Sequence, residues 1–309
     1  MSGMHARAIV PRRCQGLALV VAMLVAALAA AVAVSVATAQ SQWLSQVEHR
    51  RDQVEAQSIA TAGIAWARAI VQADTPGIDH LGEPWALPLP PTPVENGDVQ
   101  GRIVDAQSML NVNTLASAQH ASAAQQRFAR LFAALAIPAS TLASIADWVD
   151  ADDMPGAGGA EDPWYLAQGD ASLAANGPVS RFEELAAVRG MNAQAMTGLA
   201  PFVTALPGDT PVNVNTAPTE VLAALLDGIE PGALAALVAD RKQHPFTRVE
   251  DFRAKLPQGV SLIDPDLVSV DTHYFLVFVR ARQGETIANA QALIRRDAAA
   301  SSVVWQTVE

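Results

Sequence analysis

An uncharged apolar run near the N-terminus constrains this chain more than any other feature. Leu17 to Ala39 contains only Leu, Val, Ala, Met, Ser and Thr. As an α-helix this run would be about 34 Å long, which is enough to cross a bilayer. No other segment of the sequence is apolar over such a length. The remaining residues therefore have to fold in water, next to one helix that is suited to a membrane.

Three interpretations of the apolar run compete. A secretory signal peptide is indicated by Arg7, Arg12 and Arg13 before the run and by the small-x-small sequence ATA before Gln40. The run is longer than the usual apolar region of about 7 to 15 residues. An uncut signal anchor accommodates that length and would keep the arginines in the cytoplasm.

The third interpretation explains Gly16. The sequence QGLALVVAML resembles the prepilin class III signal, in which a membrane-embedded peptidase cuts after the glycine and the apolar helix stays in the mature protein. The cut would lie between Gly16 and Leu17. Position five of the mature chain would then be Val21, where that class usually carries glutamate. The mature N-terminus separates the alternatives: Leu17 for prepilin processing, Gln40 for ordinary secretion, and Met1 or Ser2 for an uncut anchor.

Charge argues against polyanionic ligands. The chain has 20 basic and 31 acidic side chains, a formal net charge of −11. Loss of a leader with its three arginines would leave 17 basic and 31 acidic side chains, or −14. Such a surface disfavours nucleic acid and anionic lipid. Cys14 would leave with the leader, so the mature domain would hold no disulfide.

The pattern beyond the apolar run predicts a helix, a loop and strands around a helical block. Gln40 to Gln72 holds no proline, and apolar residues at helical spacing would face a globular domain: Ile59, Ala62, Trp66, Ala69 and Ile70. Six prolines between Thr75 and Pro93 predict a loop without regular structure. A strand is expected at Val99 to Ala106 and short helices at about 116 to 254.

The C-terminal part has a different periodicity. From Val268 onward, VSVDTHYFLVFVRAR, TIANAQALIRR and SSVVWQTVE predict a three-stranded antiparallel meander. One strand before the helical block and three after it favour an α+β fold. In this fold, a single helix that is both transmembrane segment and spine packs on an antiparallel sheet, and an all-α domain is inserted into the sheet. The predicted boundaries are 1–16 leader, 17–39 transmembrane helix, 40–113 first part of the α+β domain, 114–267 helical insert and 268–309 C-terminal strands.

A short repeat occurs near both ends of the predicted insert. LNVNTLA at 110–116 recurs as VNVNTAP at 212–218. Thr114 and Thr216, or the asparagines beside them, are natural caps for a following helix. Either an internal duplication or independent use of the same capping residues would give this pattern.

An acidic segment, DWVDADDMPGAGGAED, is the strongest candidate site. Its six carboxylates are Asp147, Asp150, Asp152, Asp153, Glu161 and Asp162. No basic residue occurs from Leu131 to Ser180, so these like charges require either solvent or a cation.

The ligand types in this segment suit calcium. Met154 and Pro155 occupy places where an EF-hand requires an oxygen ligand and a glycine, so the segment is not an EF-hand. An oxygen-only set still favours Ca²⁺, and the absence of His and Cys argues against zinc. A solvated acidic loop is the alternative.

Catalysis finds little support in the sequence. Paired carboxylates could serve a glycosidase, but the only nearby aromatic residues, Trp148, Trp164 and Tyr165, are explained as core or loop anchors. The histidines are scattered without ligand spacing: His5, His49, His80, His120, His244 and His273. We therefore expect a protein that is not an enzyme.

Two segments resemble helix-hairpin-helix (SAM-like) repeats. They are VSRFEELAAVRGMNAQAMTGLAPFV and the stretch from VNVNTAPTEVL to FTRVEDF, the second being similar to the competence DNA-receptor type. DNA-binding versions present backbone N–H groups to phosphate at a Gly-apolar-Gly hairpin. Here Asn192 and Glu230 replace the second glycine, after Gly190 and Gly228. Packing or protein contact is therefore the favoured role, and a membrane-anchored competence-type DNA-binding protein is the alternative.

Taken together, these motifs resemble the general secretion pathway protein K family, the minor pseudopilins K of type II secretion systems. The resemblance is carried by QGLALVVAML, LGEPWALP, LNVNTL, IADWVDADDMPGAGGAEDPWYL, VSRFEELAAVRGM and VNVNTAPTEVLAAL. It implies a pilin-like α+β domain with a large α insert, and one or two Ca²⁺ ions bound in the acidic segment.

The resemblance also implies a location and partners. The chain would have a single-pass anchor in the inner membrane and a periplasmic globular domain, and it would be processed by prepilin peptidase, with N-terminal methylation left open. It would join minor pseudopilins I and J at the tip of the pseudopilus, with pseudopilin H and the major pseudopilin as further candidates. It would initiate and cap assembly for the export of folded proteins across the outer membrane.

Val21 has a physical explanation in this setting. In pilin-type fibres the glutamate at position five is thought to offset the N-terminal amine of a neighbouring subunit, because an unpaired charge in hydrocarbon is costly. A tip subunit has no neighbour above it, so an apolar side chain there has no such cost.

Overall fold

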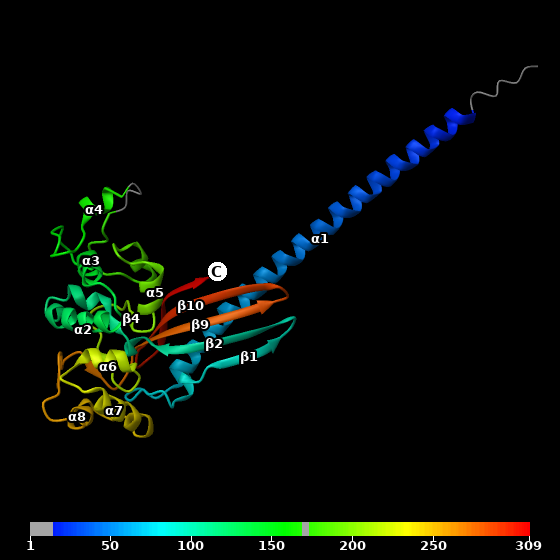
Figure 1. The fold of residues 1–309 in the computed structure, drawn as a ribbon. Coiled ribbons are helices and arrows are strands. Elements are labelled where there is room, and N and C mark those ends of the chain that lie inside the picture. The colour runs from blue at the N-terminus through cyan, green and yellow to red at the C-terminus, as the bar shows by residue number, and fades with distance from the viewer. Residues whose placement is uncertain (1–14, 169–172) are drawn as a thin grey trace, which may run out of the picture.

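A computed structural model describes residues 15–168 and 173–309. Most of the predicted leader, residues 1–14, lies outside this range. The chain begins with helix α1, Gln15–Ala73, whose first part stands free and whose second part lies along a sheet (Figure 1). The predicted long apolar helix on an antiparallel sheet is confirmed.

The sheet-facing side of α1 consists of small and aliphatic residues. Its fully covered positions follow helical spacing: Ala56, Ala60, Ile64, Ala67 and Val71. The predicted stripe was offset from this face, since Trp66 is 52% exposed. The helix approaches the sheet closely at Gly63, where a Cβ would lie 2.7 Å from Val279 Cγ1.

The five-stranded sheet has the order β1-β2-β9-β10-β11, and every neighbouring pair is antiparallel. Its strands are β1 Leu89–Val94, β2 Gly97–Asp105, β9 Tyr274–Gln283, β10 Thr286–Arg296 and β11 Ser301–Val308. The predicted strand near 99–106 and the C-terminal meander are both confirmed. Alternating side chains of β9 and β10 face α1 and form one core with it, as expected from a period of two.

The prediction that the proline-rich segment lacks regular structure was wrong. It contains the 3₁₀ turn η1, Pro84–Ala86, and strand β1, which carries Pro90, Pro91 and Pro93. These prolines are tolerated because β1 is an edge strand with a break in register between Leu89 and Thr92. An edge strand needs donors on one side only, and a proline row protects that edge from further pairing.

The helical block lies between β2 and β9 and extends beyond the C-terminal end of α1 (Figure 1). Its α-helices are α2 Ala121–Ala134, α3 Ala139–Val149, α4 Asp162–Leu166, α5 Ala193–Leu199, α6 Thr219–Leu225, α7 Pro231–Gln243 and α8 Val249–Ala254. Its 3₁₀ turns are η2 Ala106–Ser108, η3 Val112–Ala116 and η4 Phe182–Ala187. Its two-residue strands are β3 Leu110–Asn111, β4 Val203–Thr204, β5 Val212–Asn213, β6 Leu226–Asp227, β7 Ser261–Leu262 and β8 Val268–Ser269.

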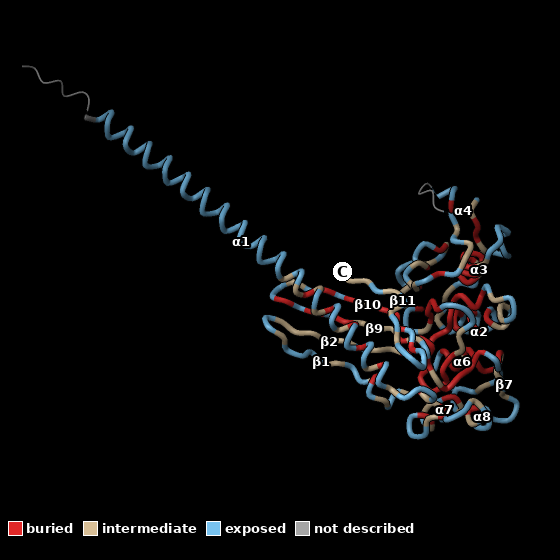
Figure 2. Tube along the Cα trace, turned by 180° about the vertical axis from the view of Figure 1, so that it is seen from behind, coloured by how far each residue is buried: buried red, intermediate tan, exposed pale blue. Residues whose placement is uncertain are grey.

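The block has a hydrophobic core of its own, separate from the core under α1 (Figure 2). The predicted limits of the insert, 114 and 267, lie just inside β3 and β8. The chain leaves the sheet after β2 and returns to it at β9, so residues 106–273 are an insertion between two neighbouring strands of one antiparallel sheet.

The helical block contains two copies of one unit. In the first, β3 pairs in parallel with β4, and in the second, β5 pairs in parallel with β8. The side-chain amide of Asn113 bonds both backbone groups of Val179: it accepts from the N–H at 2.9 Å and donates to the carbonyl at 2.9 Å. Asn215 bonds Phe246 in the same way, at 2.8 and 2.9 Å. The residues bonded in this way begin the related sequences VSRFEEL and FTRVEDF, which favours duplication over independent capping.

A buried polar network joins the second unit to the sheet. Asp105, at the end of β2, accepts hydrogen bonds from Gln107 N, Asn213 Nδ2, Thr216 Oγ1 and Thr272 Oγ1 at 2.5 to 3.0 Å. Burial raises the pKa of this carboxyl to about 6. Beside it, Arg296 forms a salt bridge with Asp79 inside the protein. Since buried polar groups are costly when unpaired, this network fixes how the block sits on the sheet.

Candidate metal centre and membrane anchor

The acidic loop connects two helices of the first unit. Helix α3 ends at Val149 and α4 begins at Asp162. Between them, Asp150, Asp152 and Glu161 bring one carboxylate oxygen each to within 4.8 Å of one another. Three of the six predicted carboxylates therefore converge.

Glu161 is the centre of this cluster. The residue is 1% exposed, and neither carboxylate oxygen has a hydrogen-bond partner among residues 15–168 and 173–309. Burial, together with the charges of Asp147, Asp150, Asp153 and Asp152, raises the pKa of Glu161 to about 7. One oxygen of Asp150 is also buried without a partner. Unpaired buried carboxylate oxygens are unfavourable by several kcal/mol unless a proton or a cation compensates them.

Asp152 Oδ1 accepts from Met154 N at 2.8 Å, and the other three predicted ligands also have partners within the protein. Asp147 accepts from Gly156 N at 3.2 Å, Asp153 from Asn176 Nδ2 at 2.6 Å and Asp162 from Ala174 N at 2.8 Å. Asp147 is nevertheless close enough to affect the pKa of Glu161. These contacts shape the loop around the three convergent carboxylates.

Glycine is required where the loop passes Asp147. A Cβ on Gly159 would lie 1.9 Å from Asp147 Oδ2, and one on Gly156 would lie 2.9 Å from Asp147 Oδ1. The sequence PGAGG is therefore explained by close approach of the backbone to this carboxylate.

Sequence reasoning missed Arg189. Its guanidinium donates to Gly159 O at 3.0 Å and lies over the ring of Trp164, 5.3 Å from the centroid. Trp148, Trp164 and Tyr165 pack edge to face beneath the loop, as predicted for core anchors. Arg189 lies 28 residues after Glu161 in the chain, and no local pattern connects the two.

No basic group within the described ranges forms a salt bridge with the acidic loop. A second carboxylate group, Asp74, Asp79 and Glu83, differs in this respect. Arg296 bonds both Asp74 and Asp79, so a cation is already present there. In the part of the chain that the structure describes, the loop alone combines convergent oxygens with buried ones that lack partners, so the residues of the loop fit an oxygen-seeking cation such as Ca²⁺.

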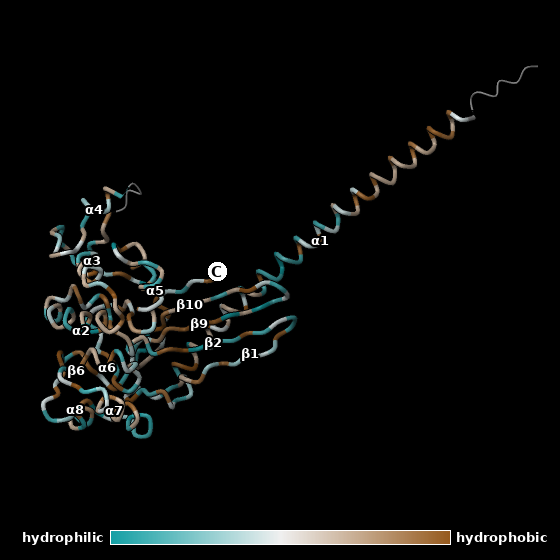
Figure 3. The backbone as a smooth tube through the Cα atoms, in the orientation of Figure 1, coloured by the Kyte–Doolittle hydropathy of each residue, from teal (hydrophilic) through white to brown (hydrophobic). Residues whose placement is uncertain are grey.

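The candidate membrane anchor is the free, apolar part of α1 (Figure 3). It contains an 18-residue window of mean hydropathy 2.9, and none of that window is buried within the protein. Val21 lies on this part and is 53% exposed. A Cβ placed on Gly16 would meet none of the described atoms within 4 Å, so packing in the described part of the chain does not require glycine there. An apolar helix left uncovered by its own protein needs a lipid or a partner around it.

The fold and site together define a protein with a long apolar N-terminal helix, an antiparallel sheet packed on the second part of that helix and a two-unit helical insert. Two family models match the chain, each described as type II secretion system (T2SS), protein K, over residues 108–208 and 212–271. The chain therefore belongs to the type II secretion system protein K family. The two matched ranges follow the two units of the helical block.

Curated relatives agree. The type II secretion system protein K of Pseudomonas aeruginosa is 36% identical over 215 residues, which covers 67% of this chain and 64% of that relative. The protein of the same name from Klebsiella pneumoniae is 32% identical over 240 residues, covering 74% and 73%. The chain thus aligns with about two thirds of the first relative.

A solved structure supports the fold. The crystal structure of the GspK-GspI-GspJ complex from the type 2 secretion system of enterotoxigenic Escherichia coli contains a chain with a TM-score of 0.67 and 26% identity. The match covers 87% of this chain and 99% of that one. The predicted family is confirmed, and the competence-type alternative finds no support in these relationships.

Proposed function

We propose that this chain is the minor pseudopilin at the tip of the periplasmic pseudopilus, where it initiates and caps assembly for the export of folded proteins. The observation that carries the proposal is the position of the helical block. It extends beyond the end of α1 that is remote from the anchor (Figure 1). In a fibre built from parallel α1 helices, the block would occupy the space above this subunit and prevent another from stacking there.

The membrane segment agrees with a terminal position. From Leu17 to Val47, α1 carries no ionisable side chain, and position five of the processed chain is Val21. No carboxylate is present there to compensate the N-terminal amine of a neighbour. An intramembrane charge is retained only where it has a partner, so its absence suits a subunit with no neighbour above it.

Partners and location follow from the same proposal. The related E. coli protein forms a complex with GspI and GspJ, and we assign the equivalent pseudopilins I and J to this chain, with H and the major pseudopilin as further neighbours. The anchor would lie in the inner membrane and the globular domain in the periplasm. The role is assembly and not catalysis.

Position in the fibre can be tested directly. Pseudopili from a strain carrying an epitope-tagged chain should bind gold-labelled antibody at one end only. Deletion of the gene should impair export of folded periplasmic proteins. Label distributed along the shaft, or normal export without the gene, would show the proposal to be wrong.

Processing by prepilin peptidase is part of this proposal. Cleavage between Gly16 and Leu17 would keep the whole anchor in the mature protein. Mass measurement of the mature N-terminus tests this, and it also shows whether Leu17 is methylated. A mature N-terminus at Gln40 would contradict the proposal, because the anchor would be lost.

We also propose that the acidic loop binds Ca²⁺ through Asp150, Asp152 and Glu161, with one or two ions in the segment. The support is the pair of buried Glu161 oxygens without partners and the oxygen-only donor set. Bound calcium would neutralise the cluster and hold the loop against α3 and α4. Isothermal titration of the full-length chain with Ca²⁺ tests binding, and absence of heat above a buffer blank would contradict it.

We further propose that the two hairpins at Gly190 and Gly228 serve packing within the block. Each glycine has a positive φ, +85° and +75°, which glycine adopts without strain. The element before Gly190 is the 3₁₀ turn η4 and not an α-helix, so the first unit departs from the helix-hairpin-helix pattern. Duplex DNA binding by the full-length chain at moderate salt would overturn this role.

A further inference from the structure

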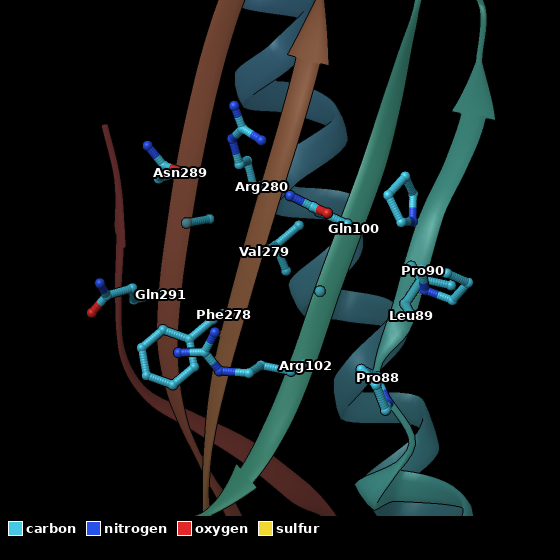
Figure 4. Close-up of a pocket in the computed structure, with 13 residues that line it drawn as sticks. Pro88, Leu89, Pro90, Gln100, Arg102, Phe278, Val279, Arg280, Asn289 and Gln291 are labelled. Carbon is cyan, nitrogen blue, oxygen red and sulfur yellow. The ribbon is translucent and has the colours of Figure 1, made fainter. Parts of the chain in front are cut away.

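A groove crosses the outer face of the sheet, opposite α1 (Figure 4). One hollow of about 560 Å³ begins at the proline-rich edge strand β1 and passes over β2 and β9 to β10. A second hollow of about 190 Å³ continues beneath the helical block. The two adjoin because both are lined by Arg102, Phe278 and Gln291.

Three arginines line this groove without acidic partners. Arg102 and Arg280 belong to the first hollow, and Arg181 belongs to the second. None of them forms a salt bridge with an acid of residues 15–168 or 173–309. Neighbouring arginines on the same sheet are paired, Arg282 with Asp98 and Arg295 with Asp297. In a chain of net charge −11, a run of unpaired cations along one groove is a local reversal of charge.

The remaining lining suits a peptide. The guanidinium of Arg102 lies 4.4 Å from the ring centroid of Phe278, so cation and aromatic ring form one platform. Side-chain amides of Gln100, Asn289 and Gln291 line the same hollow and can bond peptide groups. Trp305, at the second hollow, has a buried indole N–H without a partner. One acid, Glu183, also lines that second hollow.

The groove is long enough for an extended segment. Crossing from β1 to β10 covers three inter-strand spacings, about 14 Å, which corresponds to four or five extended residues. An extended chain of this length can reach the arginines of β2 and β9 and continue toward Arg181 at the second hollow.

We propose that this groove binds an extended acidic segment of a partner protein, with Arg102, Arg181 and Arg280 pairing its carboxylates. Charge complementarity sets the orientation and the rate of encounter. The guanidinium groups bind carboxylates through two parallel N–H donors, and Phe278 contacts an apolar residue of the segment. The site is independent of the acidic loop and of the membrane anchor.

Peptide selection tests the proposal. The full-length chain in detergent is used to select from a random dodecapeptide library, and enriched peptides are measured by fluorescence anisotropy. We expect enrichment in Asp and Glu, with affinity falling as salt rises. The double variant Arg102→Gln, Arg280→Gln should weaken the best peptides about tenfold, since exposed ion pairs contribute a few-fold each.

Two controls make the result decisive. Arg295→Gln removes one positive charge from the same sheet outside the groove and should leave peptide affinity unchanged. A single-stranded oligonucleotide of the same length measures general polyanion binding. Neutral or basic selected peptides, equal binding by the double variant, or an oligonucleotide bound as tightly as the peptides would each overturn the proposal.

Discussion

Neutralising Glu161 should have opposite effects on stability with and without calcium. In the metal-free protein its carboxylate is buried, its two oxygens lack partners and its pKa is about 7, against an ordinary value of 4.5. A raised pKa means that this group's contribution to stability is fully present below pH 4.5 and is lost as the pH rises through 7. At about pH 8 the loss amounts to about 3 kcal/mol.

The variant Glu161→Gln retains the shape of the side chain and removes its charge. In excess chelator at about pH 8 the variant should therefore have a free energy of unfolding up to about 3 kcal/mol higher than that of the natural protein. Its melting temperature should be several degrees higher. With calcium in excess the order should reverse. The natural protein gains about 2.7 kcal/mol at 100 times the dissociation constant, and the variant gains little.

Scanning calorimetry of the full-length chain in detergent, with chelator and with calcium, gives the four melting temperatures. Glu285→Gln, in the exposed turn between β9 and β10, removes the same charge far from the loop and should leave the calcium response intact. The reasoning is refuted if Glu161→Gln is the less stable protein in chelator, or if calcium stabilises both proteins equally.

Other predictions concern the junction, the loop and the anchor. Burial raises the pKa of Asp105 from 3.8 to about 6. The contribution of this carboxyl to stability is therefore present below pH 3.8 and falls by about 3 kcal/mol as the pH rises through 6. Asp105→Asn should flatten the dependence of the free energy of unfolding on pH, measured by urea unfolding. Gly159→Ala should destabilise the protein by about 2 kcal/mol through a clash with Asp147 Oδ2, whereas Gly232→Ala in α7 meets no atom within 4 Å and should be neutral or slightly stabilising. Val21→Glu should lower secretion, because it places an unpartnered carboxylate in the membrane at a cost of about 3 kcal/mol; unchanged secretion would argue against the tip explanation of this position.

The C-terminal strands were predictable because apolar side chains recur at every second position along them, whereas the edge strand β1, with its prolines, lacks this pattern and was missed. β9 has the burial alternation that its sequence YFLVFVRARQ predicts. The side of α1 that meets the sheet was not predictable from apolar spacing alone. Alanines at 56, 60 and 67 face the sheet because the backbones approach closely, and hydrophobicity does not rank alanine above tryptophan.

The acidic loop illustrates the same division within a site. Its sequence provided six carboxylates as candidate ligands, all of them oxygen donors. The sequence could not show that Glu161 is buried, or that Asp153 instead accepts a hydrogen bond from Asn176. That separation depends on a backbone path set by Gly156 and Gly159 against Asp147, and on an arginine far along the chain.

By itself the sequence determined the long apolar helix, the strands on either side of the helical block, the family and the acidic segment, because each of these depends on residues that are neighbours in the chain. Only the tertiary structure decided which carboxylates converge, that the two NVNT motifs head two copies of one unit, and that unpaired arginines from β2, β9 and the helical block line one groove. The repeat and the groove depend on contacts between residues distant in the chain, such as Asn113 with Val179, or Arg102 beside Arg181. The carboxylate cluster depends on the backbone path of the loop past Asp147. Packing, and not local pattern, fixes both.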